Sequence, residues 1–223
     1  MLLGSIEQLP FRLLALLVGL TIHEFCHAAV ASFLGDTTSQ RLGRVSLNPL
    51  KHLDPMGTVL IFLVGFGWGK PVPVNALALR SGRHGMAAVA AAGPISNLFT
   101  ATTAAIPFRL DLLDLPRTYS ITQAFSHGPE ELLSALLVFV IAFNIILAVF
   151  NLIPLFPLDG SNIALGLLPF RQGQSFAKLE RYGPGLLMLA IGADFIFHIG
   201  ILWGILGPVV NYVSLVILGE RLF

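Results

Sequence analysis

Long apolar stretches separated by polar loops dominate the pattern of this chain. They fall at about 9–34, 85–107, 131–153 and 180–219. Each is long enough for the roughly 20 residues that a membrane-spanning helix needs. The last would be about 60 Å long as one helix, too long for a single crossing, and glycines at 200, 204 and 207 offer places to turn. The pattern therefore predicts an all-α polytopic membrane protein with about five transmembrane helices.

A further apolar stretch, 56–67, is too short to span a membrane. It runs into a glycine-rich segment that ends at Gly69, and Pro71 and Pro73 follow. Because proline does not continue a helix, we expect a short re-entrant or β-hairpin insert here. Its exposed backbone groups would suit the binding of an unwound peptide by strand addition, as a hypothesis for the stretch 56–75.

Composition supports the membrane interpretation. Hydrophobic residues make up 55% of the 223 residues and charged residues only 11%, whereas a soluble domain carries roughly 25% charged residues. The mean hydropathy is +0.82. A net charge of +1 and the absence of a long basic run argue against nucleic acid as a partner. The single cysteine, Cys26, cannot form an internal disulfide.

Loop charges predict the orientation of the spans. The loop 35–84 carries six Lys and Arg residues against two Asp, whereas 108–131 carries two Arg against four acidic residues. Since basic residues prefer the cytoplasmic side, we expect 35–84 inside and the N-terminus outside.

The pentapeptide His23-Glu24-Phe25-Cys26-His27 lies near the inner end of the first predicted helix. Two histidines at i and i+4 share one helix face, so both imidazoles can reach one metal ion. The intervening glutamate can act on a metal-bound water, as in zinc peptidases. Such polar residues are costly inside a bilayer and mark functional interiors. The segment therefore predicts a catalytic metal site.

A second segment with candidate functional residues, Asn151–Gly160, follows the third predicted span on the same inner side. Pro154 and Pro157 prevent a regular helix there, and irregular backbone at membrane depth must be buried in protein or face a watery cavity. Asp159 could be an ordinary turn residue, because Asp-Gly is a strong turn signal. Its expected place beside the histidines favours a third metal ligand, which would leave a fourth position for water.

Taken together, these segments resemble the site-2 protease family of intramembrane zinc metalloproteases. The HExxH pattern is His23–His27, and the NxxPxxPLDG pattern is Asn151–Gly160. Three more segments accompany them, Asn48–Gly57, Gly67–Asn75 and Gly93–Asn97. We expect one intramembrane metalloprotease domain over 1–223, with the motif core at about 9–165 and C-terminal membrane helices at about 180–219. No loop has room for the PDZ or CBS modules that similar proteins carry.

The resemblance implies one Zn²⁺ per chain, held by His23, His27 and Asp159, with Glu24 as the catalytic base. It also implies cleavage within or near the transmembrane segments of membrane proteins, as in regulated intramembrane proteolysis. Asn151 stands at the family's position for an asparagine near the active centre, where its amide could donate to an oxyanion; a contact between helices is the alternative.

The expected partners are membrane-spanning substrates and the lipid bilayer. The expected location is the cell membrane of a prokaryote, with the active site towards the cytoplasm. The sequence does not predict an oligomeric state.

Two other functions stay open at this point. A membrane zinc protease that acts on prenylated or soluble-facing substrates also places HExxH near the inner face, but usually has a glutamate as third ligand. A non-catalytic metal-binding membrane protein would have no reason to keep Glu24 between the histidines. The sequence also leaves open the roles of Asn97, His52 and Asp54. Asp194 and His198 have the same i, i+4 spacing, but an expected location at the membrane interface explains them without a metal.

Overall fold

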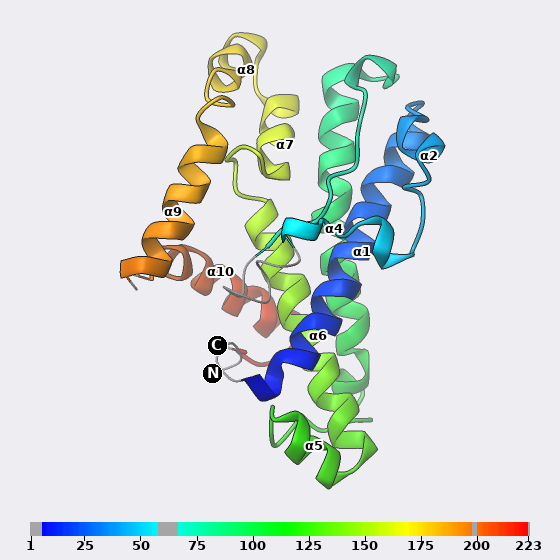
Figure 1. The fold of residues 1–223 in the computed structure, drawn as a ribbon, viewed down its shortest axis with the longest axis vertical. Helices are drawn as coiled ribbons and strands as arrows, with labels where there is room; N and C mark the ends of the chain where they lie inside the picture. Colours follow the sequence, from blue (N-terminus) through cyan, green and yellow to red (C-terminus); the bar gives the residue numbers. More distant parts are fainter. Residues whose placement is uncertain (1–5, 58–66, 198–199, 223) are drawn as a thin grey trace. The chain divides into compact units, whose positions relative to one another are not determined.

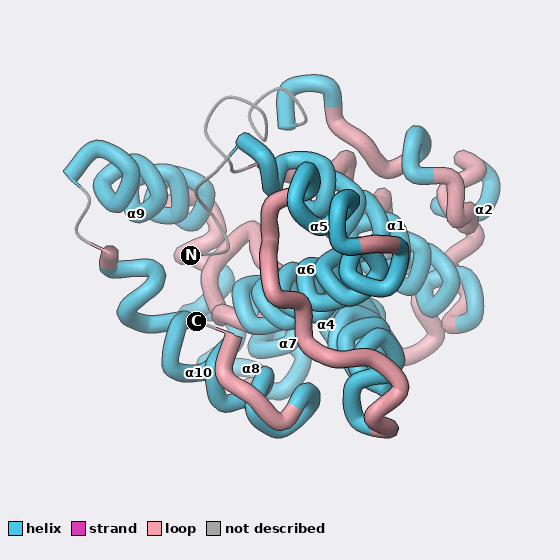
Figure 2. The backbone as a smooth tube through the Cα atoms, turned by 90° about the horizontal axis from the view of Figure 1, so that it is seen from below, coloured by secondary structure: helices cyan, strands magenta, loops and turns pink. Residues whose placement is uncertain are grey.

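The computed structural model describes residues 6–57, 67–197 and 200–222, and all regular secondary structure in these ranges is helical (Figures 1 and 2). The α-helices are α1 (Leu9–Phe33), α2 (Thr38–Arg41), α4 (Gly82–Arg109), α5 (Ile121–His127), α6 (Pro129–Asn151), α7 (Asp159–Leu167), α8 (Phe170–Ala177), α9 (Gly183–Phe197) and α10 (Ile201–Leu218). Short 3₁₀ helices are η1 (Ile6–Gln8), η2 (Pro49–Lys51) and η3 (Ala76–Ala78).

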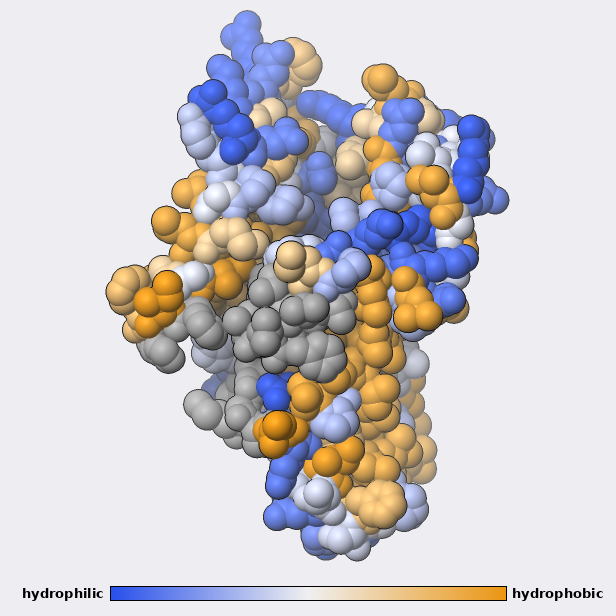
Figure 3. Space-filling view, in the orientation of Figure 1, coloured by the Kyte–Doolittle hydropathy of each residue, from blue (hydrophilic) through white to orange (hydrophobic). Residues whose placement is uncertain are grey.

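Four of the described helices are long and apolar enough to cross a membrane, counting η1 with α1: Ile6–Phe33, Gly82–Arg109, Pro129–Asn151 and Ile201–Leu218. Exposed apolar side chains cover much of the face in Figure 3, as contact with lipid requires. The protein is thus a multi-pass integral membrane protein, and its regular secondary structure is helical throughout the described residues, in agreement with the predicted all-α class.

The expected count of five spans stays a prediction. The stretch 180–219 divides into two helices, but the apolar part of α9, Gly183–Asp194, is shorter than the other spans. Gly200 starts α10 with φ of 70°, the left-handed conformation that glycine adopts without strain. It is one of the turning points that the sequence indicated.

The hairpin expected at 56–67 lies mostly on residues 58–66, outside the described residues. On either side of it, Leu53 and Gly69 form an isolated antiparallel bridge. Segment 70–75 continues without helical structure until η3 begins.

The chain divides into two compact units. The first comprises Met1–Gly19, Asn97–Phe150 and Gly185–Phe223, and the second comprises Leu20–Ser96 and Asn151–Pro184. The core of the first unit contains a group of aromatic rings: Phe139 stacks on Phe11 at 5.4 Å between ring centroids and on Phe143 at 6.2 Å. Tyr119 meets the same Phe139 ring edge-on.

Two fully buried asparagines join helices within the first unit. Asn97 on α4 donates from its side-chain amide to Asn144 Oδ1 on α6 at 2.8 Å and to the Gly19 carbonyl at 3.0 Å. Asn144 in turn donates to the Val140 carbonyl at 2.8 Å. Side-chain amides that bond across spans hold helices together where no water is present. This network accounts for Asn97, whose role the sequence left open.

Candidate metal centre

The three polar residues of the first motif lie on α1 in the second unit. His23, Glu24 and His27 are buried, with 5%, 8% and 7% of their surface exposed. As the i, i+4 spacing predicted, the two imidazoles face each other, with their Nε2 atoms 2.9 Å apart and their rings edge to face. The Nε2 atoms of both histidines are thus close enough to bind the same ion.

The second nitrogen of His27 has its own partner. Its Nδ1 lies 2.7 Å from the backbone carbonyl of Val89 on α4. A carbonyl only accepts hydrogen bonds, so Nδ1 carries the proton, and Nε2 of the neutral ring presents a lone pair. A metal-ligating histidine is commonly oriented in this way.

Asp159 arrives from a different segment. The chain leaves α6 at Asn151, turns through Ile153–Leu158 and starts α7 at Asp159. Ser161 fastens this turn, since its backbone N–H and its hydroxyl both donate to the Leu158 carbonyl, at 3.0 and 2.7 Å. Asp159 is therefore the first residue of a helix rather than an ordinary turn residue.

Gly160 allows α7 to begin there. A Cβ atom at this position would lie 2.3 Å from the Leu152 carbonyl oxygen and 2.4 Å from that of Ile153. The glycine of the Asp-Gly pair thus serves a close approach between backbones and not a left-handed turn.

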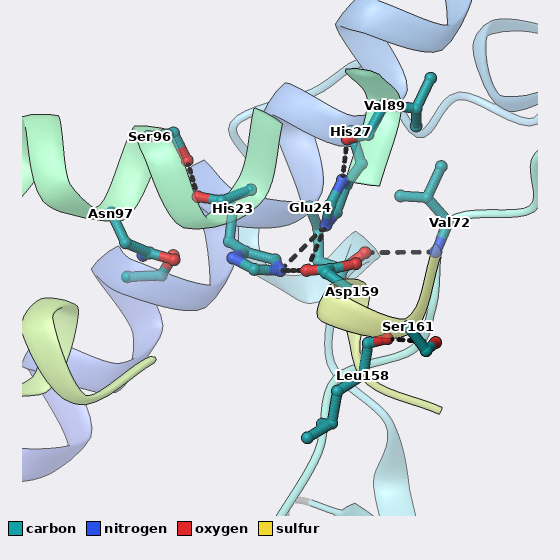
Figure 4. Close-up of polar contacts among 12 residues, drawn as sticks. His23, Glu24, His27, Val72, Val89, Ser96, Asn97, Leu158, Asp159 and Ser161 are labelled. Carbon is teal, nitrogen blue, oxygen red and sulfur yellow. Dashed lines mark hydrogen bonds and ion pairs between the residues drawn. The ribbon is translucent and has the colours of Figure 1, made fainter. Parts of the chain in front are cut away.

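The carboxylate of Asp159 meets both histidines (Figure 4). Its Oδ2 lies 3.1 Å from Nε2 of His23 and 3.2 Å from Nε2 of His27. Despite these distances neither contact has good hydrogen-bond geometry, so Oδ2 is buried without a hydrogen-bond partner among the described residues. A buried polar atom in this state calls for an explanation, and a metal ion is one.

The three atoms fit a zinc ion. In tetrahedral coordination with bonds of about 2.0–2.1 Å, neighbouring ligand atoms lie about 3.3 Å apart. The observed separations of 2.9, 3.1 and 3.2 Å are close to this value. Two imidazoles and one carboxylate are also the ligand types of catalytic zinc sites that keep one position open.

Gly93 on α4 leaves room beside the two rings. A Cβ atom here would lie 2.5 Å from Cε1 of His23 and 2.5 Å from Nε2 of His27. The Ser96 hydroxyl donates to the Gly93 carbonyl at 2.7 Å, which stabilises the same helical turn. Only glycine keeps this side of the cluster open.

The Glu24 carboxylate has a separate partner. Its Oε2 accepts a hydrogen bond from the backbone N–H of Val72 at 3.2 Å. It does not belong to the group of His23, His27 and Asp159, whose ligand atoms all lie within 4.8 Å of one another. The carboxylate stands next to the cluster in sequence without being one of its three members.

The other residues that the sequence singled out lie elsewhere or have partners. Asn151 is the half-buried last residue of α6, and its oxyanion role stays a prediction. His52 is fully buried with Nε2 2.7 Å from the Ser46 carbonyl, and Asp54 accepts from the Gly57 N–H at 2.8 Å, so both order the loop. Asp194 accepts from the Ile201 N–H at 2.7 Å, and His198 lies outside the described residues.

The sequence did not predict three features that the structure shows: two at the candidate metal centre and one in the helix contacts of the first unit. The space at Gly93 and the Val72 N–H leave no mark in the residue types alone, although a glycine before Pro94 inside a helix is a hint. Asn144 could have been found, because it is a lone amide in the middle of an apolar span.

Known proteins share parts of this sequence. Residues 109–191 match Peptidase family M50. The chain is also 40% identical over 178 residues to a Bacillus subtilis (strain 168) protein named "Putative zinc metalloprotease YwhC", in an alignment that covers 80% of this chain and 78% of that protein. No solved structure matches the chain significantly.

Proposed function

Because the chain belongs to peptidase family M50, the site-2 protease family of membrane zinc metalloproteases, we propose that it cleaves peptide bonds within or near the transmembrane segments of membrane proteins. One observation carries this proposal: Nε2 of His23, Nε2 of His27 and Oδ2 of Asp159 converge within 3.2 Å, and two of the three come from an apolar helix of spanning length. A metal site on such a helix suits a substrate that arrives through the membrane.

The mechanism assigns one task to each side chain. His23, His27 and Asp159 hold the zinc ion. Zinc at such a site supplies a Lewis acid for the scissile carbonyl and makes water more acidic. Glu24 accepts the proton of the attacking water and passes it to the leaving amine. Asn151 donates from its side-chain amide to the oxyanion that develops on the carbonyl.

The substrate has to be unwound before it is cut. Peptide bonds in a helix are shielded, and breaking their hydrogen bonds costs several kcal/mol per unsatisfied group where water is absent. Segment 56–75 receives the unwound chain by strand addition in this proposal. The non-helical course of residues 70–75 supports that role.

Loop charges support the finer topology. With the basic loop 35–84 in the cytoplasm, the N-terminus lies outside and the active site faces the cytoplasmic side of a prokaryotic cell membrane. In this arrangement α9 is a fifth crossing, and residues 1–223 act as one catalytic domain. The cleavage of membrane proteins by such a domain would be a step of regulated intramembrane proteolysis.

Substrate trapping with Glu24→Gln tests the proposal. The variant keeps all three ligands, so it should retain about one zinc per chain while proteolysis falls by about 10²–10⁴-fold. Intact membrane proteins should then copurify with it, and wild-type enzyme should cut them inside a spanning segment. Glu180→Gln changes an exposed glutamate far along the chain and serves as the control. Near-normal cleavage by Glu24→Gln would refute the mechanism, and cuts confined to soluble loops would favour a protease of soluble-facing substrates.

A further inference from the structure

We propose that Val72 is a positioning residue, whose backbone N–H holds the Glu24 carboxylate in the orientation needed for proton transfer. The non-helical segment 69–75 presents this N–H to the carboxylate. The inference rests on the proposed role of Glu24 as the base.

The contact itself is direct. Oε2 of Glu24 accepts from Val72 N at 3.2 Å, and the glutamate is buried. A buried carboxylate needs hydrogen-bond donors, and a backbone N–H is a donor that neither rotates away nor titrates. Such fixed dipoles stabilise a reacting group without reorganising.

The prolines on both sides of Val72 leave its N–H without a neighbouring backbone donor. Pro71 and Pro73 have no N–H, so Val72 supplies the one backbone donor among residues 71–73. Their rings also fix φ on each side of Val72, which stiffens the backbone that carries the N–H. The segment thus offers one donor in a constrained place.

The N-terminal end of the segment is held by the loop before it. The Lys70 N–H donates to the carbonyl of the fully buried His52 at 2.8 Å, beside the bridge between Leu53 and Gly69. The buried Arg44 guanidinium donates to the carbonyls of both Lys51 and Lys70. Two residues before Val72, the chain therefore has a fixed position.

The C-terminal end is held by the residues that follow α1. Asp36, which is 1% exposed, accepts from the Asn75 N–H through Oδ2 at 2.6 Å and from the Thr38 N–H through Oδ1 at 3.0 Å. Val74 packs against the small core of Ala31, Leu79 and Val89. Both anchors lie within three residues of Val72, so its N–H has little freedom to move.

Precise placement matters for the base. A general base must lie within about 2.6–3.2 Å of the group whose proton it takes, and a misplacement of about 1 Å can cost a hundredfold in rate. A glutamate has three rotatable side-chain bonds, so the Val72 contact selects among its rotamers. Loss of this N–H should affect turnover more than substrate binding.

Val72→Pro removes the N–H and keeps an apolar side chain at this position. With a membrane protein captured by the Glu24→Gln trap as substrate, we expect kcat to fall about 10- to 100-fold, with KM and zinc content unchanged. Val72→Ala, which keeps the N–H, should recover most of that loss. Ala76→Pro places a proline at the exposed first residue of η3, where proline is tolerated, and leaves the Val72 N–H and both anchors in place, so its kcat should stay near the wild-type value.

The inference is wrong if Val72→Pro turns over normally, or if Val72→Pro and Ala76→Pro lose activity equally. Loss of zinc from Val72→Pro would also overturn it, because the segment would then support the metal ligands rather than Glu24. Failure of the proposed function is distinguishable, since it shows as cleavage by Glu24→Gln whatever Val72→Pro does.

Amide hydrogen exchange in ¹⁵N-valine-labelled protein tests the contact without an activity assay. We expect the Val72 amide to exchange slowly in the wild type and faster in Glu24→Ala, while the Val74 amide is unchanged. Equal exchange of the Val72 amide in both proteins would contradict the proposal, even if Val72→Pro did not fold.

Discussion

Gly93 lies so close to His27 that a Cβ atom at position 93 would sit 2.5 Å from the His27 Nε2. Helix α4 therefore contributes to the candidate metal centre in two ways: Gly93 leaves space for the His27 ring, and the Val89 carbonyl orients the same ring. One helix without a ligand of its own thus shapes the site on α1.

Gly93→Ala should reduce zinc binding. The added methyl group needs the space next to both imidazoles, so the rings must move apart and the affinity for zinc should fall about 10- to 100-fold or more. Zinc per purified chain, measured by elemental analysis during chelator titration, checks this. Gly192→Ala is the matched control, because a Cβ atom there meets nothing within 4 Å. Wild-type affinity in Gly93→Ala would show that the rings have room to adjust.

Removal of any proposed ligand should release the ion. His23→Ala, His27→Ala and Asp159→Ala each leave two ligands, so we expect each to lose most of the single zinc that the wild type holds. His84→Ala, on an exposed residue of α4, should keep it. Full zinc content in Asp159→Ala would remove that carboxylate from the coordination shell.

Asp36→Asn should destabilise the second unit in a pH-dependent way. Burial raises the pKa of Asp36, but hydrogen bonds from Thr38 and Asn75 outweigh it and bring this pKa below the usual value of about 3.9. Because the folded pKa is depressed, the contribution to stability is complete above about pH 5 and is lost as the pH falls through the folded value.

The new side-chain amide in Asp36→Asn would face backbone N–H donors, at a cost of about 1–3 kcal/mol at neutral pH. The free energy of unfolding in detergent, measured between about pH 3 and 7, should therefore be lower for the variant than for the wild type. This difference should narrow below about pH 4. Asp114→Asn alters a carboxylate outside this network and should show no such gap. A gap independent of pH would mean that the Asp36 charge does not contribute.

Substrate helices that unwind easily should be cut faster. Gly, Pro or Asn near the scissile bond weakens the helix beforehand, so their replacement by leucine should slow cleavage without changing the zinc content of the enzyme. Reporter proteins with one span, differing only at these positions, allow the rates to be compared by mass spectrometry. Equal rates for leucine-rich and glycine-containing spans would show that unwinding does not limit the reaction.

Periodicity and residue type predicted what depends on local geometry. The spacing of His23 and His27 fixes a shared helix face in any α-helix, and the observed Nε2 separation of 2.9 Å follows from it. The prolines at 154 and 157 likewise predicted the break between α6 and α7. Both inferences needed only the backbone rules of a few consecutive residues.

Contacts between segments that are distant in sequence could not be predicted from such local rules. Glu24 and Val72 are far apart in sequence, and nothing in a valine between two prolines indicates which carboxylate its N–H will meet. The role of Gly160 was hidden for the same reason, because the pair Asp-Gly looks the same whether glycine supplies a turn or a close approach. The roles of Val72 and Gly160 depend on which other segment of the chain packs against them in the folded protein.

The two prolines beside Val72 also decide how this stretch can pair with another chain. Residues 71–73 have one N–H, and Glu24 occupies it, so only carbonyl oxygens remain for pairing. A peptide aligned beside them must then supply the N–H groups itself. In an intact helix the backbone N–H groups are already bonded within the helix. An edge that offers only acceptors can therefore pair with an unwound segment but not with a helical one, whatever side chains the segment carries.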